Sequence, residues 1–349
     1  MNKRPPKNGE KRQTIQNTLL VDGNALFKAS ISGAKGLYNK DGVHIGGTYQ
    51  FLTTLRMLLN EDLYHRVYVF WDGNFSGKLR YEIYKSYKGD RGKDFINGTQ
   101  PIDISELSQR KAIWDYLNEM YIRQLKHPII EGDDFIAYYC NHKKNNEKIT
   151  ICTNDRDMAQ LINNDVKIYF TDLKKYVDYS NYSLYFRHKQ ENSVLLKTIA
   201  GDKSDCIKGI KGVGETTLLK LFPELIERKV TLNEILLSAK QQNEERIPIK
   251  KPLKVLTNIL EAITDGEQGK RIYEINEKLV NLKNPMMTPD GIEALEQLIN
   301  GTLSSSGREL KTVLMMMKQD GLDKAIGEHR YPDYLIPFIK LIDRENKNY

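Results

Sequence analysis

Two acidic clusters near the middle of the chain carry the side chains best suited to chemistry. Each cluster comes directly after an apolar segment of β type, at 128–130 and at 149–152. Sites in an open α/β sheet collect at the carboxyl ends of the strands, so we expect both clusters to face one crevice. Crowded carboxylates repel unless a hard divalent cation with oxygen ligands offsets their charge. The pattern predicts a magnesium-type site, open enough to accept a phosphate, built from Glu131, Asp133, Asp134, Asp155 and Asp157.

Two further carboxylates follow apolar segments earlier in the chain. Asp22 ends the run 18–21, and Asp72 ends the run 67–71. A single Asp at a strand end is more often a helix cap or a turn residue than a ligand. Four strand ends that each lead into carboxylates are difficult to explain as caps alone, so we add both residues to the predicted site.

The elements that must position these carboxylates alternate along the chain. Helical patterns at 48–60 and 105–126 separate the expected strands, and tight hairpin signals are missing. Such alternation predicts an α/β fold with a central, mostly parallel sheet and helices on both faces. Strands are expected at 18–21, 67–71, 128–130, 149–152 and 166–170.

A basic and aromatic segment at 75–100 follows the strand that ends at Asp72. Basic residues interleaved with tyrosines suit a phosphate backbone and stacked bases. The alternative is a helix whose tyrosines pack on the core while its lysines are only solvated. The position of the segment beside the acidic site favours nucleic-acid binding. Its basic and aromatic residues include Lys78, Arg80, Tyr81, Tyr84, Lys85, Tyr87, Lys88, Arg91 and Lys93.

A glycine-bearing turn enters a helix at 209–214. Backbone N–H groups in such a turn can hold a phosphate oxygen without reading sequence. An ordinary connection between two helices would look similar, and only the neighbouring carboxylates favour a site. The residues concerned are Asp202, Asp205, Lys208, Gly209, Lys211, Gly212 and Gly214.

Composition limits the class of protein. The 349 residues are 40% apolar and carry a formal net charge of +7, although many acidic residues are assigned to one site. The remaining surface must therefore be more basic than the total, which favours a polyanionic partner. Three cysteines without CxxC spacing argue against a disulfide or zinc framework. No run of about 18 apolar residues and no signal-peptide core is present, so we expect a soluble, intracellular protein.

The six histidines form no zinc-ligand or Ser-His-Asp pattern, which disfavours zinc hydrolysis and acyl transfer. The chemistry must therefore come from the carboxylates and from bound cations.

Motifs in order across residues 18–225 resemble the 5′ nuclease superfamily, which includes flap endonucleases, the 5′-nuclease domain of bacterial DNA polymerase I and phage 5′→3′ exonucleases. The likeness lies in Val21-Asp22-Gly23, Phe70-Trp71-Asp72-Gly73, Tyr87-Lys88-Gly89-Asp90-Arg91, Glu131-Gly132-Asp133-Asp134, Thr153-Asn154-Asp155-Arg156-Asp157 and the segment 201–214. A weaker likeness at 310–326 suggests the ribonuclease H branch of T-even phages. Asn154 and Cys206 depart from the Gly and Asn that are usual there.

The resemblance implies two Mg²⁺ ions, with Mn²⁺ able to substitute, and a K⁺ ion at the turn. It assigns Asp22, Asp72, Glu131 and Asp133 to the first metal, and Asp155, Asp157 and Asp205 to the second, supported by Asp134 and Asp202. Asp133 and Asp155 would be catalytic together with Lys88 and Arg91, which contact the scissile phosphate. Tyr87 would stack on the terminal base, and Arg80 and the turn would bind DNA.

The resemblance also implies an organisation and a function. It gives a flexible basic arm at 1–17, a nuclease core at 18–193 with an arch at about 75–110, and a helical DNA-binding region with a C-terminal extension, described as helix–turn–helix, at 194–349. We expect a monomeric, cytoplasmic enzyme, in the host cytoplasm if phage-encoded. It would cut DNA with a free 5′ end, flaps or RNA–DNA duplexes during primer removal.

Two other functions stay open from the sequence. A PIN-type ribonuclease would share the acidic crevice but cut single-stranded RNA, and a non-catalytic DNA-binding factor would keep the fold alone. A sliding clamp or a single-strand DNA-binding protein is a candidate partner of the tail.

Overall fold

The computed structural model describes residues 15–89, 103–246, 250–264, 266–301, 309–327 and 329–347, without the side chains of 264–271 and 345–347. Most of the arm 1–17 and of the segment 90–102, with Arg91, lies outside these ranges. No helix among the described residues is long and apolar enough to cross a membrane.

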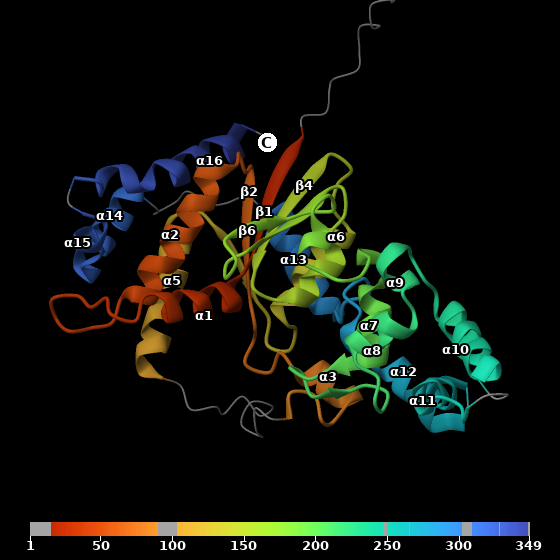
Figure 1. Cartoon of the computed structure of the whole chain (residues 1–349). Helices are drawn as coiled ribbons and strands as arrows, with labels where there is room; N and C mark the ends of the chain where they lie inside the picture. The colour runs from red at the N-terminus through yellow and green to blue at the C-terminus, as the bar shows by residue number, and fades with distance from the viewer. Residues whose placement is uncertain are drawn as a thin grey trace, which may run out of the picture.

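A six-stranded sheet at the centre of the molecule has the order β3-β2-β1-β4-β5-β6 (Figure 1). Five strands are parallel, and the edge strand β6 is antiparallel to β5. In the central register, Leu20 of β1 pairs with Tyr68 of β2 and with Ile151 of β4. The strands are β1 Gln16–Asp22, β2 Arg66–Trp71, β3 Arg123–Lys126, β4 Glu147–Thr153, β5 Val166–Phe170 and β6 Lys175–Val177.

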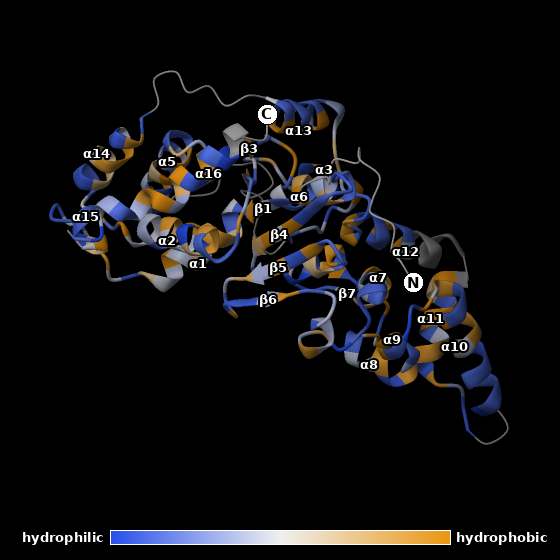
Figure 2. Ribbon diagram, turned by 90° about the horizontal axis from the view of Figure 1, so that it is seen from above, coloured by the Kyte–Doolittle hydropathy of each residue, from blue (hydrophilic) through white to orange (hydrophobic). Residues whose placement is uncertain are grey.

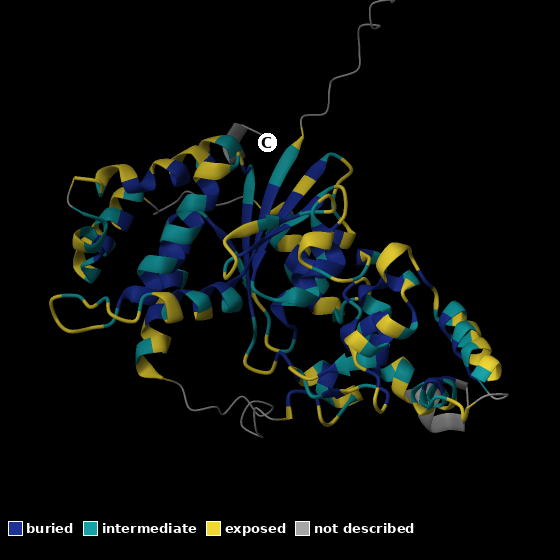
Figure 3. Cartoon of the chain, viewed as in Figure 1, coloured by how far each residue is buried: buried dark blue, intermediate teal, exposed yellow. Residues whose placement is uncertain are grey.

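The central strands are buried on both faces, as Figure 3 shows. Leu19, Leu20 and Val21 of β1 are each fully buried. Near-continuous apolar runs are typical of parallel strands that are covered by helices on both sides. The predicted parallel α/β sheet is therefore confirmed.

One face of the sheet is covered by α1 (Gly23–Gly33), α2 (Gly46–Glu61) and α5 (Ile104–Glu119). Leu52, Leu55 and Leu58 of α2 are fully buried here, in the helix expected at 48–60. The C-terminal helices α14 (Leu310–Asp320), α15 (Leu322–Ile326) and α16 (Ile336–Lys347) add an outer layer to the same core. In Figures 1 and 2, α14 lies beside α5 and α16 beside α2.

The other face packs against α6 (Gly132–Asn141), the 3-10 helix Arg156–Leu161 and α13 (Pro289–Asn300). Phe135 of α6 stacks on Phe70 of β2, with ring centroids 5.8 Å apart. Together the two helical layers enclose the sheet and hold its strand ends in place.

A third group of helices extends away from the sheet and has its own core (Figure 2). It contains α7 (Ser193–Ala200), α8 (Glu215–Leu221), α9 (Glu224–Glu227), α10 (Leu232–Arg246), α11 (Lys254–Thr264) and α12 (Gly266–Val280). Between α7 and α8 lies a short antiparallel hairpin, β7 (Gly201–Asp202) with β8 (Ile207–Lys208). The expected helix–turn–helix therefore contains a hairpin that the sequence did not indicate.

Two expectations about elements are wrong. The third strand is Arg123–Lys126 and not 128–130, and the helix predicted at 105–126 ends at Glu119. The chain bends after β3 because Pro128 has no N–H for a ladder, while its carbonyl accepts from Phe75 N at 2.9 Å. Within the region 194–349, α13 to α16 return to the two faces of the sheet.

Candidate active site

An acidic cleft opens at the carboxyl ends of the parallel strands. Its volume is about 790 Å³. The predicted site residues that line it are Asp22, Asp72, Lys88, Glu131, Asp133 and Asp155. They come from β1, β2, β4, the start of α6 and the loop after α3 (Lys78–Ile83), so segments far apart in the sequence meet at one sheet edge.

Local hydrogen bonds fix the first two carboxylates. Asp22 caps α1 by accepting from Ala25 N at 2.9 Å, and its other oxygen accepts from Thr153 Oγ1 at 2.9 Å. Asp72 accepts from Gly132 N at 2.8 Å, at the first turn of α6. Asp22 is therefore a helix cap and Asp72 a turn residue, and both also line the cleft. The interpretation as cap or turn residues and the interpretation as site residues are compatible.

Gly23 explains how closely the first two strands approach. A Cβ at this position would lie 2.6 Å from the Trp71 ring and 2.9 Å from the Phe70 carbonyl oxygen. Only glycine lets α1 start directly beside the end of β2, which brings Asp22 and Asp72 to the same crevice.

Electrostatic repulsion within the cleft is strong. Burial, followed by the neighbouring Asp72, raises the pKa of Asp22 to about 6. Burial and the charge of Asp155 raise the pKa of Asp133 well above its usual range. Carboxylates held together against their own repulsion are a suitable environment for a cation.

The donor set fits hard divalent cations. The described residues that line the cleft offer carboxylate, amide and hydroxyl oxygens but no Cys or His. Oxygen ligands of this kind suit Mg²⁺ or Mn²⁺ and disfavour zinc. Among the described residues, no three His, Cys, Asp or Glu side chains are already gathered into a closed ligand cage. The carboxylates line an open cleft, which leaves room for a substrate phosphate.

Lys88 brings a positive charge into this cleft. Its ammonium pairs with Glu131, and its backbone N–H donates to the Asp205 carbonyl at 2.9 Å. Burial alone would raise the pKa of Glu131, but the charges of Lys88 and Arg80 lower it to about 2. Lys88 has φ 49, a conformation that is uncommon for a residue with a side chain. The loop after α3 is thus held in the geometry that aims the ammonium at the carboxylates.

Three predicted roles need correction because the side chains are buried elsewhere. Arg80 is 5% exposed and donates to Asp134 at 2.6 and 2.9 Å, so it cannot reach DNA. Asp134 is fully buried by that pair and also accepts from Met286 N, and it does not line the cleft. Tyr87 is 2% exposed and donates to Glu131 at 3.1 Å, so its ring is not a stacking surface.

Asp157 and Asp202 line a neighbouring cavity together with Lys197. The Lys197 ammonium pairs with Asp157 and, at 2.6 Å, with Asp202. Burial and Asp155 raise the pKa of Asp157 to about 7. Burial opposes ionisation of Asp202, but Lys197 lowers the pKa of Asp202 to about 2. Lys197 was missed from the sequence, although it stands one helical turn before Asp202.

Asp205 joins the two cavities through its neighbours. Its carboxylate accepts from Tyr87 Oη at 3.4 Å, and burial with further charges from Asp22 and Asp205 raises the pKa of Asp155. Of the three carboxylates assigned from the resemblance to a second metal, Asp155 lines the acidic cleft and Asp157 the neighbouring cavity, while Asp205 contacts Tyr87.

The glycine turn follows the hairpin β7–β8, and the Asp205 carbonyl between these two strands accepts from the Lys88 N–H beside the cleft. A Cβ on Gly209 would lie 2.0 Å from the Ala200 carbonyl oxygen, and Gly212 has φ +80. The turn places Lys208 and Lys211 in solvent and leads through Gly214 into α8. The backbone bend at 209–214 is thus present with two exposed lysines, and its binding of a phosphate stays a prediction.

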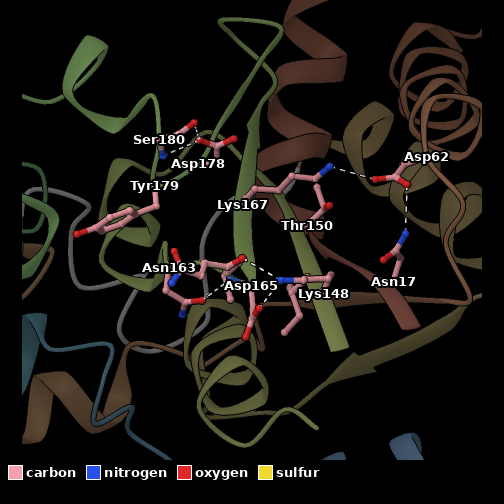
Figure 4. Close-up of a pocket in the computed structure, with 13 residues that line it drawn as sticks. Asn17, Asp62, Lys148, Thr150, Asn163, Asp165, Lys167, Asp178, Tyr179 and Ser180 are labelled. Carbon is pink, nitrogen blue, oxygen red and sulfur yellow. Dashed lines mark hydrogen bonds and ion pairs between the residues drawn. The ribbon is translucent and has the colours of Figure 1, made fainter. Parts of the chain in front are cut away.

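A polar pocket at the amino ends of the parallel strands differs from the acidic cleft in its balance of charge (Figure 4). Its lysines and carboxylates neutralise each other, since Lys148 pairs with Asp165 at 2.5 Å and Lys167 with Asp62 at 3.0 Å. The acidic cleft has no comparable balance of charge, which makes it the candidate active site.

A family model described as the 5'-3' exonuclease N-terminal resolvase-like domain matches residues 17–189. This range contains the carboxylates of strands β1, β2 and β4 and the start of α6. The chain belongs to the 5′ nuclease superfamily.

The similar proteins are replication enzymes and exonucleases. A DNA polymerase I from Thermus caldophilus is 32% identical over 211 residues, which are 59% of this chain and 24% of that protein. The chain thus spans about a quarter of the polymerase's length. A 5'-3' exonuclease from Mycoplasmopsis pulmonis is 28% identical over 243 residues, covering 68% of this chain and 77% of that one.

The fold also agrees with a solved member of the superfamily. A flap endonuclease of bacteriophage T5, in a pseudo-enzyme-product complex with DNA and metal ions, superposes with a TM-score of 0.57. Identity is 17%, and the match covers 93% of this chain and 99% of that chain.

The two departures from the superfamily pattern have different consequences. Asn154 does not adopt a left-handed backbone conformation here. Its side chain accepts from Asp172 N at 2.9 Å and fixes the loop after β5. Cys206, by contrast, has φ 56, a conformation that Asn adopts more readily. Cys206 therefore strains the hairpin next to Asp205.

Proposed function

We propose that the protein is a structure-specific 5′ nuclease, a 5′→3′ exonuclease and flap endonuclease that acts on DNA or RNA–DNA duplexes. The supporting observation is the meeting of five carboxylates and Lys88 in one cleft, with the Lys88 backbone bonded to the hairpin that leads into the glycine turn. A role in primer removal follows from the similarity to DNA polymerase I.

The proposed cofactors are two Mg²⁺ ions, with Mn²⁺ as a substitute. When bound, such ions would supply activation of water and stabilisation of the leaving oxygen. Asp22, Asp72, Glu131 and Asp133 would hold the first ion, and Asp155, Asp157 and Asp205 the second. Lys197, bonded to Asp157 and Asp202, would set the charge around the second.

The chain's own groups orient the substrate. Lys88 is the described cation in the cleft nearest to Glu131, and it would neutralise charge that develops on the scissile phosphate. Arg91 is proposed to assist it, from outside the described residues. No protein nucleophile is required, because water supplies the attacking oxygen.

The turn at 209–214 would hold the duplex backbone. Its N–H groups and the exposed Lys208 and Lys211 suit phosphates. We extend the proposal to a K⁺ ion at this turn. The carbonyls of Lys208 and Lys211 already accept hydrogen bonds from Asn276 and Asn258, so the ion would use other oxygens of the turn.

Cleavage of a 5′-labelled flap duplex and a matched nicked duplex tests the proposal. With Mg²⁺ we expect products on the 5′ strand near the junction, and with Ca²⁺ we expect binding without cleavage. Cleavage of unpaired RNA alone would instead identify a PIN-type ribonuclease, and binding without cleavage in Mg²⁺ would identify a non-catalytic factor.

The variant Asp155→Asn should abolish cleavage and leave DNA binding nearly unchanged, because it removes a ligand charge and little volume. Asp165→Asn is the matched control, since Asp165 lies at the amino ends of the parallel strands (Figure 4). Single-turnover rates and fluorescence anisotropy measure the two properties. Normal turnover by Asp155→Asn would refute the metal assignment.

A further inference from the structure

A second cavity, of about 660 Å³, lies between the loop after α3 and the glycine turn. Its described walls come from four places: Tyr84 and Ser86 after α3, residues 208–211 at the end of β8, and parts of α11 and α12. This cavity shares no lining residue with the acidic cleft. The cavity is therefore a hollow separate from the acidic cleft.

The floor of this cavity is apolar. Ile210, Ile272 and Ile275 line it together with Ala262 of α11. Ile272 is 43% exposed, an unusual fraction for a large apolar side chain that faces a hollow. A flat, apolar ligand would cover this surface and remove it from water.

The rim of the same cavity is basic and polar. Lys208 and Lys211 are exposed and form no ion pair with any side chain that the structure describes. Tyr84 adds a half-buried ring, and Glu261 of α11 adds a carboxylate acceptor. The rim thus suits a phosphate at the lysines, and the aromatic ring and the acceptor suit a base.

The walls are held together by two side-chain amides. Asn276 is 2% exposed and donates to the carbonyls of Lys208 at 2.9 Å and Thr198 at 3.0 Å. Asn258 donates to the Lys211 carbonyl at 2.8 Å. These bonds tie the turn to α11 and α12, so the hollow exists before any ligand enters.

We propose that this cavity binds one unpaired nucleotide of the DNA substrate, with the base over the isoleucine floor and the phosphate at Lys208 and Lys211. The cavity is in the size range of ligand pockets and is too narrow for a duplex. Its position beside the proposed duplex-holding turn continues the DNA surface. The inference rests on the proposed 5′ nuclease function, because it takes DNA as the ligand.

The test uses a series of flap duplexes, each with a single 2-aminopurine at one successive position around the junction, bound to the full chain in Ca²⁺. We expect one position to change its fluorescence about threefold on binding, because an aromatic side chain and an apolar floor replace the neighbouring bases. A series without any such position would overturn the proposal.

Two variants assign the signal to the cavity. Ala262→Trp fills the hollow and should remove the position-specific change, while Ile272→Ser should weaken flap-duplex binding about threefold. Leu237→Trp is the control, since Leu237 is 69% exposed on α10 and does not line the cavity. A signal that survives both Ala262→Trp and Ile272→Ser would overturn the proposal.

Mg²⁺-dependent cleavage is measured in parallel on the same substrates. Cleavage without a cavity-dependent signal overturns only this inference, whereas absence of cleavage by the wild-type protein overturns the proposed function itself.

Discussion

The ammonium of Lys88 lies beside Glu131 in a cleft whose charged lining residues are mainly carboxylates. The centroid of the neighbouring Tyr87 ring is 4.9 Å from the same ammonium. A substrate phosphate that entered the cleft would compete with Glu131 for this charge. Lys88 therefore has to be held firmly by its backbone, which its bond to the Asp205 carbonyl provides.

Lys88→Ala should lower the single-turnover rate about 100-fold with little change in DNA affinity, because Lys88 would act on charge that develops in the transition state. Lys85→Ala is the control, since Lys85 is exposed and stands over the Tyr81 ring. Rapid-quench kinetics on a flap duplex measures the rate. An unchanged rate would remove Lys88 from the site.

Arg80→Met should lower the free energy of unfolding by about 3–5 kcal/mol, because it removes the guanidinium that pairs with the buried carboxylates of Asp134 and Glu131 and leaves Asp134 without a cation. Lys78→Met is the control and should change it by less than about 0.5 kcal/mol, since that exposed side chain pairs only with Glu82. Urea unfolding followed by circular dichroism measures both. If the Arg80→Met variant were stable but bound DNA more weakly, the predicted contact of Arg80 with DNA would be correct after all.

The sequence predicted which carboxylates gather in the cleft, because strand ends in a parallel sheet meet at one edge. It could not predict where Arg80 and Tyr87 point. Both lie in a basic and aromatic segment whose composition suits DNA, yet α3 turns Arg80 to the core and the loop after α3 buries Tyr87. Only the packing of α3 against α6 and α12 decides that.

The hairpin and turn between α7 and α8 form the element that connects the cleft to the proposed duplex surface. Asp202 and Asp205 stand on one side of it, and Lys208 and Lys211 on the other. Ile210 N donates to the Ile199 carbonyl at 2.9 Å, which ties the turn to the end of α7. The backbone that positions Asp202 and Asp205 therefore also positions Lys208 and Lys211.

Gly209→Ala should weaken binding to a nicked duplex about tenfold, because the new Cβ would lie 2.0 Å from the Ala200 carbonyl oxygen and push the turn outward. Gly36→Ala is the control, since its Cβ would have no atom within 4 Å and Gly36 lies outside the turn. Anisotropy titrations in Ca²⁺ measure both affinities. Equal affinities for the two variants would show that the turn does not bind the duplex.

Element boundaries were harder to predict from the sequence than element types. The strand Arg123–Lys126 carries three polar side chains, so it lacks the apolar run that marked the others, and the run at 128–130 became a bend. The hairpin β7–β8 has strands of two residues each, which leave no periodicity to detect.

At the scale of the whole molecule, the C-terminal helices belong to the same core as the first strand. Tyr334 Oη lies 3.0 Å from Thr53 Oγ1, and Arg56 donates to the Tyr334 carbonyl at 3.0 Å. Both contacts fix α2, which supplies Gln50 and Thr54 to the wall of the acidic cleft. The extension thus supports the site from the far side of α2.

Phe338→Ala should lower the free energy of unfolding by about 3–5 kcal/mol, because this fully buried ring joins α16 to the core of α2. Ile339→Ala on the same helix is the control, since Ile339 is 41% exposed and should cost less than about 1 kcal/mol. Thermal and urea unfolding measure the change, and flap cleavage well below the melting temperature should stay near the wild-type rate. Equal stabilities for the two variants would mean that the C-terminal extension is an appendage and not part of the core, and the support of α2 from that side would have to be abandoned.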